Sequence, residues 1–192
     1  SVNYKPQEMA TRNMYEKNPS EFLLWYFKRF ILLKNIKPNK THYWLSNKCL
    51  ITQNIDGLDR KAGNKNYIGI HGNIDKLVVF DNQDTIQEPK NANWDEIDRE
   101  YLDNDLKLKK ILLEKFKIPI KNSEYTPEKG VSLKPLVLLF DEIYNENYRF
   151  NEALTWMESC TKMIFMGTSF SVNITNIALE IAIEKNLPIE IV

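Results

Sequence analysis

The chain has 192 residues, and its 26 basic and 26 acidic side chains give a formal net charge of zero. That balance excludes a strong overall field for nucleic acid or an anionic membrane surface. A hydrophobic fraction of 43% is enough for a sizeable core in one domain with a small insert. Cys49 and Cys160 form no Cys-x-x-Cys pair, which excludes a cysteine zinc site. They lie far apart in apolar surroundings, which favours reduced, buried thiols, with a disulfide as the alternative.

Neither a signal peptide nor a membrane span is predicted. Residues 1–5 lack the apolar segment of a signal peptide. The least polar late stretch, residues 163–179, is interrupted by Gly167 and by two asparagines. We therefore expect an intracellular protein, either cytoplasmic or nuclear.

The first 72 residues predict a helical segment followed by two short strands. Asn18, Pro19 and Glu21 are typical of a helix start, and aromatic residues follow at helical spacing. Residues 49–52 form a short apolar run that predicts a buried strand, and polar side chains follow it directly. A second apolar run, residues 67–70, leads into His71 and a glycine.

The middle of the chain has a different character. Nine carboxylates between residues 81 and 105 are balanced there only by Lys90 and Arg99. This composition predicts a solvated insert whose acidic run buries little apolar surface, although an acidic patch for a basic partner is an alternative. We expect residues 81–130 to be the least stable region. Residues 106–116 predict a helix within the insert.

The last third alternates between strands and helices. Strands are predicted at residues 136–140, 162–166 and 188–192, with helices at 150–160 and 174–185. The second of these strands runs into Gly167, Thr168 and Ser169. A glycine and two hydroxyls between a strand and a helix are typical of a phosphate or nucleotide cradle, although the signal is weak by itself.

This order predicts an α/β fold with a doubly wound, mainly parallel, Rossmann-like sheet and a small inserted helical and acidic module. We expect residues 1–72 and 131–192 to form the two parts of the core, with residues 73–130 as the insert. Right-handed crossovers bring the ends of parallel strands to one edge of a sheet. The polar residues that follow the strands should therefore meet in one crevice.

Three of these segments resemble the sirtuin family: residues 52–63 (Thr-Gln-Asn-Ile-Asp-Gly-Leu-Asp-Arg-Lys-Ala-Gly), 70–72 (Ile-His-Gly) and 167–172 (Gly-Thr-Ser-Phe-Ser-Val). Residues 4–11, 18–19, 37–42 and 133–142 are also similar to segments of that family. The resemblance implies an NAD-dependent protein-lysine deacylase with a Rossmann-like core. Such an enzyme transfers the acyl group to ADP-ribose and releases nicotinamide.

The resemblance also implies roles for individual residues. His71 matches the general base that activates a ribose hydroxyl, a task that suits an imidazole with an ordinary pKa of about 6.5. Three further residues match contacts to the ribose and the nicotinamide pocket: Gln53, Asn54 (also counted with the catalytic residues) and Asp56. The remaining matches are nucleotide contacts at Gly167, Thr168 and Ser169, and a strand edge that pairs with a substrate peptide at Phe140, Asp141 and Glu142.

The sequence also departs from the family pattern. The family's amino-terminal Gly-Ala-Gly loop would come just before residue 1, and its adenine-side asparagine would come just after Val192. We expect both to lie outside this sequence, with a degenerate paralogue as the alternative. Val79 and Asn82 stand where the first pair of zinc cysteines would be, so we expect no metal and an insert held by packing alone. Asp59 replaces a common histidine, and Asp141 replaces a glycine.

Three functions remain open on this evidence. The first is deacylation of an acyl-lysine protein or peptide with NAD. The second is NAD hydrolysis or ADP-ribosyl transfer in the same pocket, which the altered Asp141 and the lost zinc cysteines favour. The third is a non-catalytic, sirtuin-shaped binding module. No membrane or nucleic-acid partner is expected.

Overall fold

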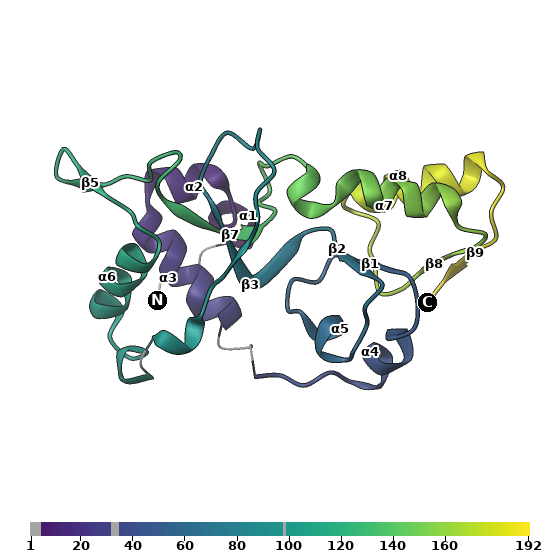
Figure 1. Cartoon of the computed structure of the whole chain (residues 1–192), viewed down its shortest axis with the longest axis horizontal. Helices are drawn as coiled ribbons and strands as arrows, with labels where there is room; N and C mark the ends of the chain where they lie inside the picture. The colour runs from purple at the N-terminus through teal and green to yellow at the C-terminus, as the bar shows by residue number, and fades with distance from the viewer. Residues whose placement is uncertain (1–4, 32–34, 98) are drawn as a thin grey trace. The chain divides into compact units, whose positions relative to one another are not determined.

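The computed structural model describes residues 5–31, 35–97 and 99–192, which form two compact units, residues 1–148 and 149–192 (Figure 1). Each unit is described by itself. Residues 1–4 lie outside the described residues. The predicted absence of a signal peptide falls on them, as does residue 4, the first residue of the segment 4–11 that resembles the sirtuin family. The three-part division made from the sequence stays a prediction.

The first unit combines helices with short strands. Its elements in chain order are α1 (Pro6–Met9), α2 (Arg12–Lys17), α3 (Pro19–Phe30), α4 (Lys40–Leu45), β1 (Leu50–Thr52), α5 (Leu58–Lys61), β2 (Tyr67–Gly69), β3 (Gly72–Val79), β4 (Lys90–Asn91), η2 (Trp94–Glu96), η3 (Arg99–Tyr101), α6 (Asp105–Lys115), β5 (Ile120–Lys121), β6 (Glu124–Tyr125), β7 (Leu133–Val137) and η4 (Glu146–Tyr148). Four of the helices begin at a side chain that accepts a hydrogen bond from a backbone N–H of the first turn. These caps are Thr11, Asn18, Asn39 and Asn104.

Strands β1 and β2 confirm the two short strands predicted before His71. They pair in parallel, with Leu50 opposite Tyr67 and Thr52 opposite Gly69. The connection between them contains α5, as expected of a parallel pair, which needs a crossover rather than a tight turn.

The predicted strand near residue 136 is present, but its pairing differs from the expectation. It is β7, Leu133–Val137, and it pairs antiparallel with β3, whose other edge carries β4. Strand β3 lies in the segment that the sequence assigned to the insert. Three of the eight residues of β3 are buried, namely Ile74, Leu77 and Val78. The strand therefore belongs to the packed interior.

The core of the first unit lies between these strands and two helices, α3 and α6, which lie side by side (Figure 1). Tyr15 is fully buried, and its hydroxyl donates to the carbonyl of Leu133 at 2.6 Å. Its ring packs edge to face against Phe22 and Phe80, with centroids 5.3 and 5.2 Å apart. Aromatic pairs of this geometry add to the stability gained from their buried area.

The acidic stretch contributes to this core, so the prediction that it buries little apolar surface is wrong. Trp94 is only 4% exposed, and Ala92 and Ile97 are also buried. The indole N–H of Trp94 donates to the carbonyl of Ile74 at 2.8 Å, and its ring lies 5.9 Å from that of Phe116. Several carboxylates of the stretch, such as Asp84, Glu88 and Asp95, are exposed around these apolar anchors. Its relative stability stays a prediction.

The second unit has the alternating order predicted for it: α7 (Phe150–Ser159), β8 (Met163–Phe165), α8 (Asn173–Glu184) and β9 (Ile189–Ile191). Strands β8 and β9 pair in parallel, with Met163 opposite Ile189. Small and apolar side chains of the two helices, such as Ala153 and Ala182, are buried. All four predicted elements of this unit are therefore confirmed.

The structure also bears on the predictions for the cysteines and for a membrane span. Both cysteines are free thiols, but Cys49 is exposed and Cys160 is half-buried, so the prediction of buried thiols is wrong. Each lies just outside a regular element, next to a strand start or a helix end. Among the described residues, no helix is long and apolar enough to cross a membrane.

We expect Trp94→Ala to lower the free energy of unfolding by about 3–5 kcal/mol, because it removes a buried aromatic ring and its hydrogen bond. Denaturant unfolding measures the change. Trp44 is 54% exposed, so Trp44→Ala is the matched control and should change stability by less than about 1 kcal/mol. Equal effects of the two substitutions would contradict the core position of Trp94.

Candidate functional site

The loop after β1 carries the polar side chains that the sequence singled out. The hydroxyl of Thr52 accepts from the N–H of Asn54 at 3.2 Å, which folds the chain out of the strand. The carboxylate of Asp56 accepts from the N–H of Leu58 at 2.9 Å at the start of α5. The side-chain amides of Gln53 and Asn54 have no hydrogen-bond partner among the described residues. These two amides therefore remain available to a ligand.

The buried carboxylate of Asp59 helps to hold this loop. Asp59 is 4% exposed, and burial raises the pKa of its side chain. The charge of His42 and a hydrogen bond from the hydroxyl of Thr52 act in the opposite direction. Thr52 thus donates to Asp59 and accepts from Asn54, so the departure from the family pattern at residue 59 takes part in holding the loop.

His71 lies in the turn between β2 and β3, and its backbone is held from both sides. The N–H of Ile70, just before it, donates to the carbonyl of Thr52 at 3.0 Å. The carbonyl of His71 itself accepts from the N–H of Leu138 at 3.0 Å. The backbone around the histidine is thereby fixed beside the end of β1 and beside the residues that follow β7.

The residue after His71 has to be glycine. Gly72 has φ of +91°, a conformation that other residues rarely adopt. A Cβ at this position would lie 1.9 Å from the carbonyl oxygen of Leu136, which is a backbone clash with no side chain to move aside. Gly72 therefore permits β3 and β7 to approach closely where the histidine emerges.

The imidazole of His71 is partly buried between two polar partners. Its Nε2 lies 2.9 Å from the hydroxyl of Tyr144, and the two rings stack with centroids 5.9 Å apart. Burial lowers the pKa of His71, and a hydrogen bond to the backbone of Gln53 partly offsets that effect. His71 is therefore mostly neutral at pH 7, which is the form that accepts a proton.

The segment predicted to pair with a substrate peptide follows β7 as a turn. The N–H of Phe140 donates to the carbonyl of Ala10 at 3.0 Å, while its ring is 63% exposed. The carboxylate of Asp141 accepts from the backbone N–H groups of Arg12 and Asn13 at 2.5 and 3.0 Å. Asp141 thus stabilises the first turn of α2, where a negative charge is favourable.

Glu142 is also engaged within the protein. Its side chain is 2% exposed and forms an ion pair of 2.7 Å with Lys134, which is itself buried. It also accepts from the N–H of Leu139 at 3.1 Å and from the guanidinium of Arg12 at 3.3 Å. Strand addition pairs main-chain groups, and the backbone N–H groups of Phe140 and Glu142 already donate to the carbonyls of Ala10 and Leu139. The role of Phe140, Asp141 and Glu142 in substrate binding stays a prediction.

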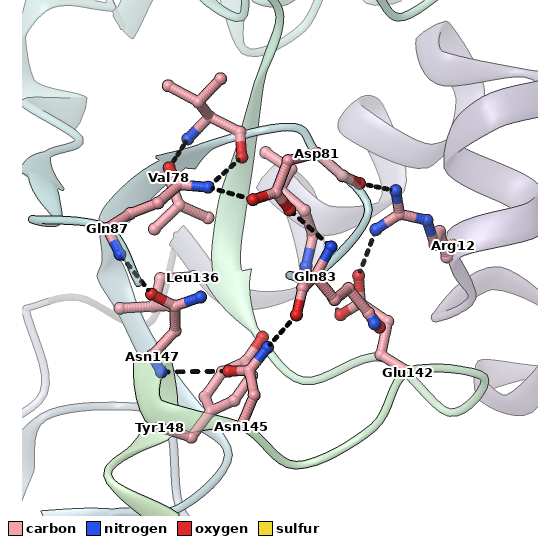
Figure 2. Close-up of a pocket in the computed structure, with 12 residues that line it drawn as sticks. Arg12, Val78, Asp81, Gln83, Gln87, Leu136, Glu142, Asn145, Asn147 and Tyr148 are labelled. Carbon is pink, nitrogen blue, oxygen red and sulfur yellow. Dashed lines mark hydrogen bonds and ion pairs between the residues drawn. The ribbon is translucent and has the colours of Figure 1, made fainter. Parts of the chain in front are cut away.

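A polar pocket is lined by residues of β3, of β7 and of the segments that follow each strand, together with Arg12 of α2. Figure 2 shows its lining side chains. The amide of Gln87 donates to the carbonyl of Val79 at 2.8 Å and accepts from the N–H of Val79 at 2.6 Å. It also donates to Asp81 at 2.9 Å. One side chain thus closes the loop formed by residues 81–87.

The same pocket joins this loop to residues 143–147. Asn147 accepts from the N–H of Gln87 at 2.7 Å and donates to the carbonyl of Thr85 at 2.9 Å. Asn145 donates to the carbonyl of Gln83 at 3.3 Å (Figure 2). We call these bonds, between residues 81–87 and 143–147, the amide network. Within the described part of the chain, no cluster of three metal-ligating side chains occurs.

Gly167, Thr168 and Ser169 lie in the second unit, between β8 and α8. Gly167 has φ of +61°, and its N–H donates to the carbonyl of Val192 at 3.0 Å. The hydroxyl of Thr168 accepts from the N–H of Phe170 at 3.3 Å. These residues form a turn between a strand and a helix, as predicted. Their convergence with His71 in one crevice stays a prediction.

The Sir2 family model matches residues 2–174. The chain belongs to the Sir2 family. An NAD-dependent protein deacylase of Pyrococcus abyssi is 29% identical over 175 residues, which cover 86% of this chain and 60% of the relative. A protein of the same description from Archaeoglobus fulgidus is 37% identical over 78 residues, 37% of this chain and 32% of the relative.

Solved structures of the family have the same fold. The crystal structure of a Sir2 homologue in complex with NAD superposes with a TM-score of 0.72 at 23% identity, covering 98% of this chain and 66% of that one. This likeness confirms the predicted Rossmann-like α/β class. The chain spans between about a third and 60% of the length of the two curated relatives named above.

Sequence reasoning missed a residue beside His71 and two residues of the polar pocket. Tyr144, Lys134 and Gln87 are each defined by a partner at least eight positions away in the chain. A tyrosine within the polar run that follows residue 140 is the only sequence signal for Tyr144. Nothing in the local pattern distinguishes Lys134 or Gln87 from ordinary surface side chains.

Gly72→Ala should destabilise the first unit strongly, by about 3 kcal/mol or more, because the added Cβ meets a backbone carbonyl. Gly130→Ala is the matched control. Its φ is also positive, +79°, but the space around its Cβ is open, so it reports strain alone at about 1 kcal/mol. Urea unfolding of both variants measures the difference, and similar losses would contradict the close approach at Gly72.

Glu142→Gln should cost about 3–5 kcal/mol of unfolding free energy, because it leaves the buried Lys134 ammonium without its counter-charge. The matched control is Glu190→Gln, which breaks the exposed pair with Lys162. Exposed pairs contribute about 1 kcal/mol or less. Thermal unfolding compares the two variants, and an unchanged midpoint for Glu142→Gln would contradict the buried pair.

Proposed function

We propose that the protein is an NAD-dependent protein-lysine deacylase of the sirtuin type, which transfers the acyl group to ADP-ribose and releases nicotinamide. The observation that carries this proposal is the placement of His71. A partly buried imidazole with a lowered pKa lies beside a loop whose Gln53 and Asn54 amides have no partner among the described residues. A base and two open amide groups suit a ribose and a carboxamide.

The residues present fit NAD. Gln53 and Asn54 would hold the ribose and nicotinamide side, and Gly167, Thr168 and Ser169 would contact the rest of the nucleotide. Asp56 would contribute by fixing the start of α5, since its carboxylate accepts from Leu58. NAD, when bound, supplies the activated ribose carbon to which the acyl oxygen becomes attached.

His71 would act as the general base for a ribose hydroxyl. A general base must be uncharged, and the lowered pKa keeps this imidazole neutral to a lower pH than an ordinary histidine. The activity should therefore fall on the acid side at a lower pH than it would with an ordinary histidine.

NAD hydrolysis or ADP-ribosyl transfer is the second candidate, and one observation favours it. At the expected peptide-binding edge, the backbone N–H groups of Phe140 and Glu142 already donate to the carbonyls of Ala10 and Leu139. Water or another nucleophile would need no such edge. For either reaction we infer an intracellular location, cytoplasmic or nuclear, since NAD is an intracellular metabolite. An acyl-lysine protein or peptide would be the partner of the first reaction only.

His71→Ala should lower nicotinamide release by roughly 10²- to 10⁴-fold in the whole protein to which this chain belongs, with little change in NAD affinity or melting temperature. The rate is measured with and without an acetyl-lysine peptide. His42→Gln, at the chain's other histidine, is the control and should retain most of the activity.

Equal rates for the wild type and His71→Ala would rule out the general-base role. Release from the wild type that does not depend on the peptide would replace deacylation by NAD hydrolysis. Release that depends on the peptide, with formation of an acylated ADP-ribose, would support deacylation.

A further inference from the structure

His71 has a partner that the proposed reaction does not yet use. The hydroxyl of Tyr144 lies 2.9 Å from Nε2 of His71, and the stacked rings, tilted by 26°, limit the freedom of both side chains. A ligand hydroxyl that donates to the same nitrogen would have to displace Tyr144 or bind to it. The position of Tyr144 therefore decides how a proton reaches the imidazole.

The second partner of the ring indicates which proton lies where. The backbone of Gln53 raises the pKa of His71, so it interacts with the ring through its carbonyl, which accepts a hydrogen bond. A neutral imidazole that donates there has one remaining lone pair. With this lone pair on Nε2, the hydroxyl of Tyr144 donates to it. No charged side chain is among the causes of the shift at His71.

Tyr144 is held in place by its neighbours along the chain. The N–H of Ile143 donates to the side chain of Gln83 at 3.3 Å, and Asn145 donates to the carbonyl of the same residue at 3.3 Å. The amide network thus grips the residues on both sides of Tyr144. A tyrosine on a tethered loop is preorganised, which is what a group that transfers a proton requires.

We propose that Tyr144 is a second catalytic residue, which relays the proton from the substrate hydroxyl to His71. In this step the substrate O–H bond breaks and its proton forms a new O–H bond on the Tyr144 oxygen. At the same time the original Tyr144 proton moves to Nε2. The tyrosine ends neutral, the histidine ends as imidazolium, and the electron pair stays on the substrate oxygen. The proposal rests on the function proposed above.

The relay also accounts for the charged product of the step. Imidazolium donates from Nε2 to the oxygen of Tyr144, and a hydrogen bond from a charged donor is stronger than one between neutral groups. The tyrosine therefore stabilises the charged form of His71 more than its neutral form. Without that hydroxyl, the pKa of His71 should fall further.

The first test needs no NAD. Tyr144→Phe removes only the hydroxyl and keeps the stacking ring. The chain has two histidines, so the imidazole signals of His71 and His42 can be assigned by substitution and titrated by NMR. We expect the pKa of His71 to fall by roughly half to one pH unit in Tyr144→Phe. An unchanged titration would overturn the coupling between the two side chains.

The second test is kinetic, on the whole protein. Tyr144→Phe should lower the rate of acyl transfer by about 10- to 100-fold with an unchanged KM for NAD. The loss is smaller than that of His71→Ala because, without the tyrosine hydroxyl, the substrate hydroxyl can donate directly to Nε2 of His71. The dependence of the rate on the deuterium content of the solvent should indicate two transferred protons in the wild type and one in the variant. Tyr43→Phe, an exposed tyrosine on α4, is the matched control.

The outcomes distinguish failure of the Tyr144 relay from failure of the proposed function. Full or raised activity of Tyr144→Phe, with His71→Ala inactive, would overturn the relay and leave the general base in place. Full activity of His71→Ala would instead overturn the proposed function itself. If Tyr144→Phe has low activity and its NMR spectrum shows an unfolded protein, Tyr144→His is the second variant, because its imidazole can also transfer a proton. A folded Tyr144→His that does not regain activity would also overturn the relay.

Discussion

The position of His71 depends on the close backbone approach of Gly72 to Leu136. Only a residue without Cβ permits it, because a Cβ would lie 1.9 Å from the carbonyl oxygen. The N–H of Leu138 then reaches the carbonyl of His71, so the histidine is fixed by main-chain atoms on the side of β7. Main-chain atoms therefore set the position of the histidine backbone.

Two sets of polar contacts hold the segments around His71 in place. The ion pair of Lys134 and Glu142, joined by Arg12, ties the end of β7 to α2. The amide network ties residues 81–87 to the segment that carries Tyr144. Buried polar groups are costly when a partner is missing and rigid when every partner is present. The geometry around the imidazole is therefore sensitive to residues that never approach it.

The sequence predicts the parts of this structure that depend on local pattern. The strands on either side of α5, the position of His71 and the α-helices of the second unit follow from short apolar runs and polar boundaries. Pairing direction does not follow, because an apolar run such as that of β7 is compatible with either direction. Composition also misleads around Trp94, since one buried ring outweighs several outward carboxylates. Contacts such as Arg12 to Asp141, 129 positions apart, leave no local signal.

The amide network has a consequence for how the fold tolerates change. A tetrahedral metal centre fails as a whole when one ligand is lost, and its integrity depends on the supply of the ion. Gln87, Asn147 and Asn145 instead share the task among separate hydrogen bonds of modest individual strength. Loss of one bond loosens the loop by a step and leaves the others in place.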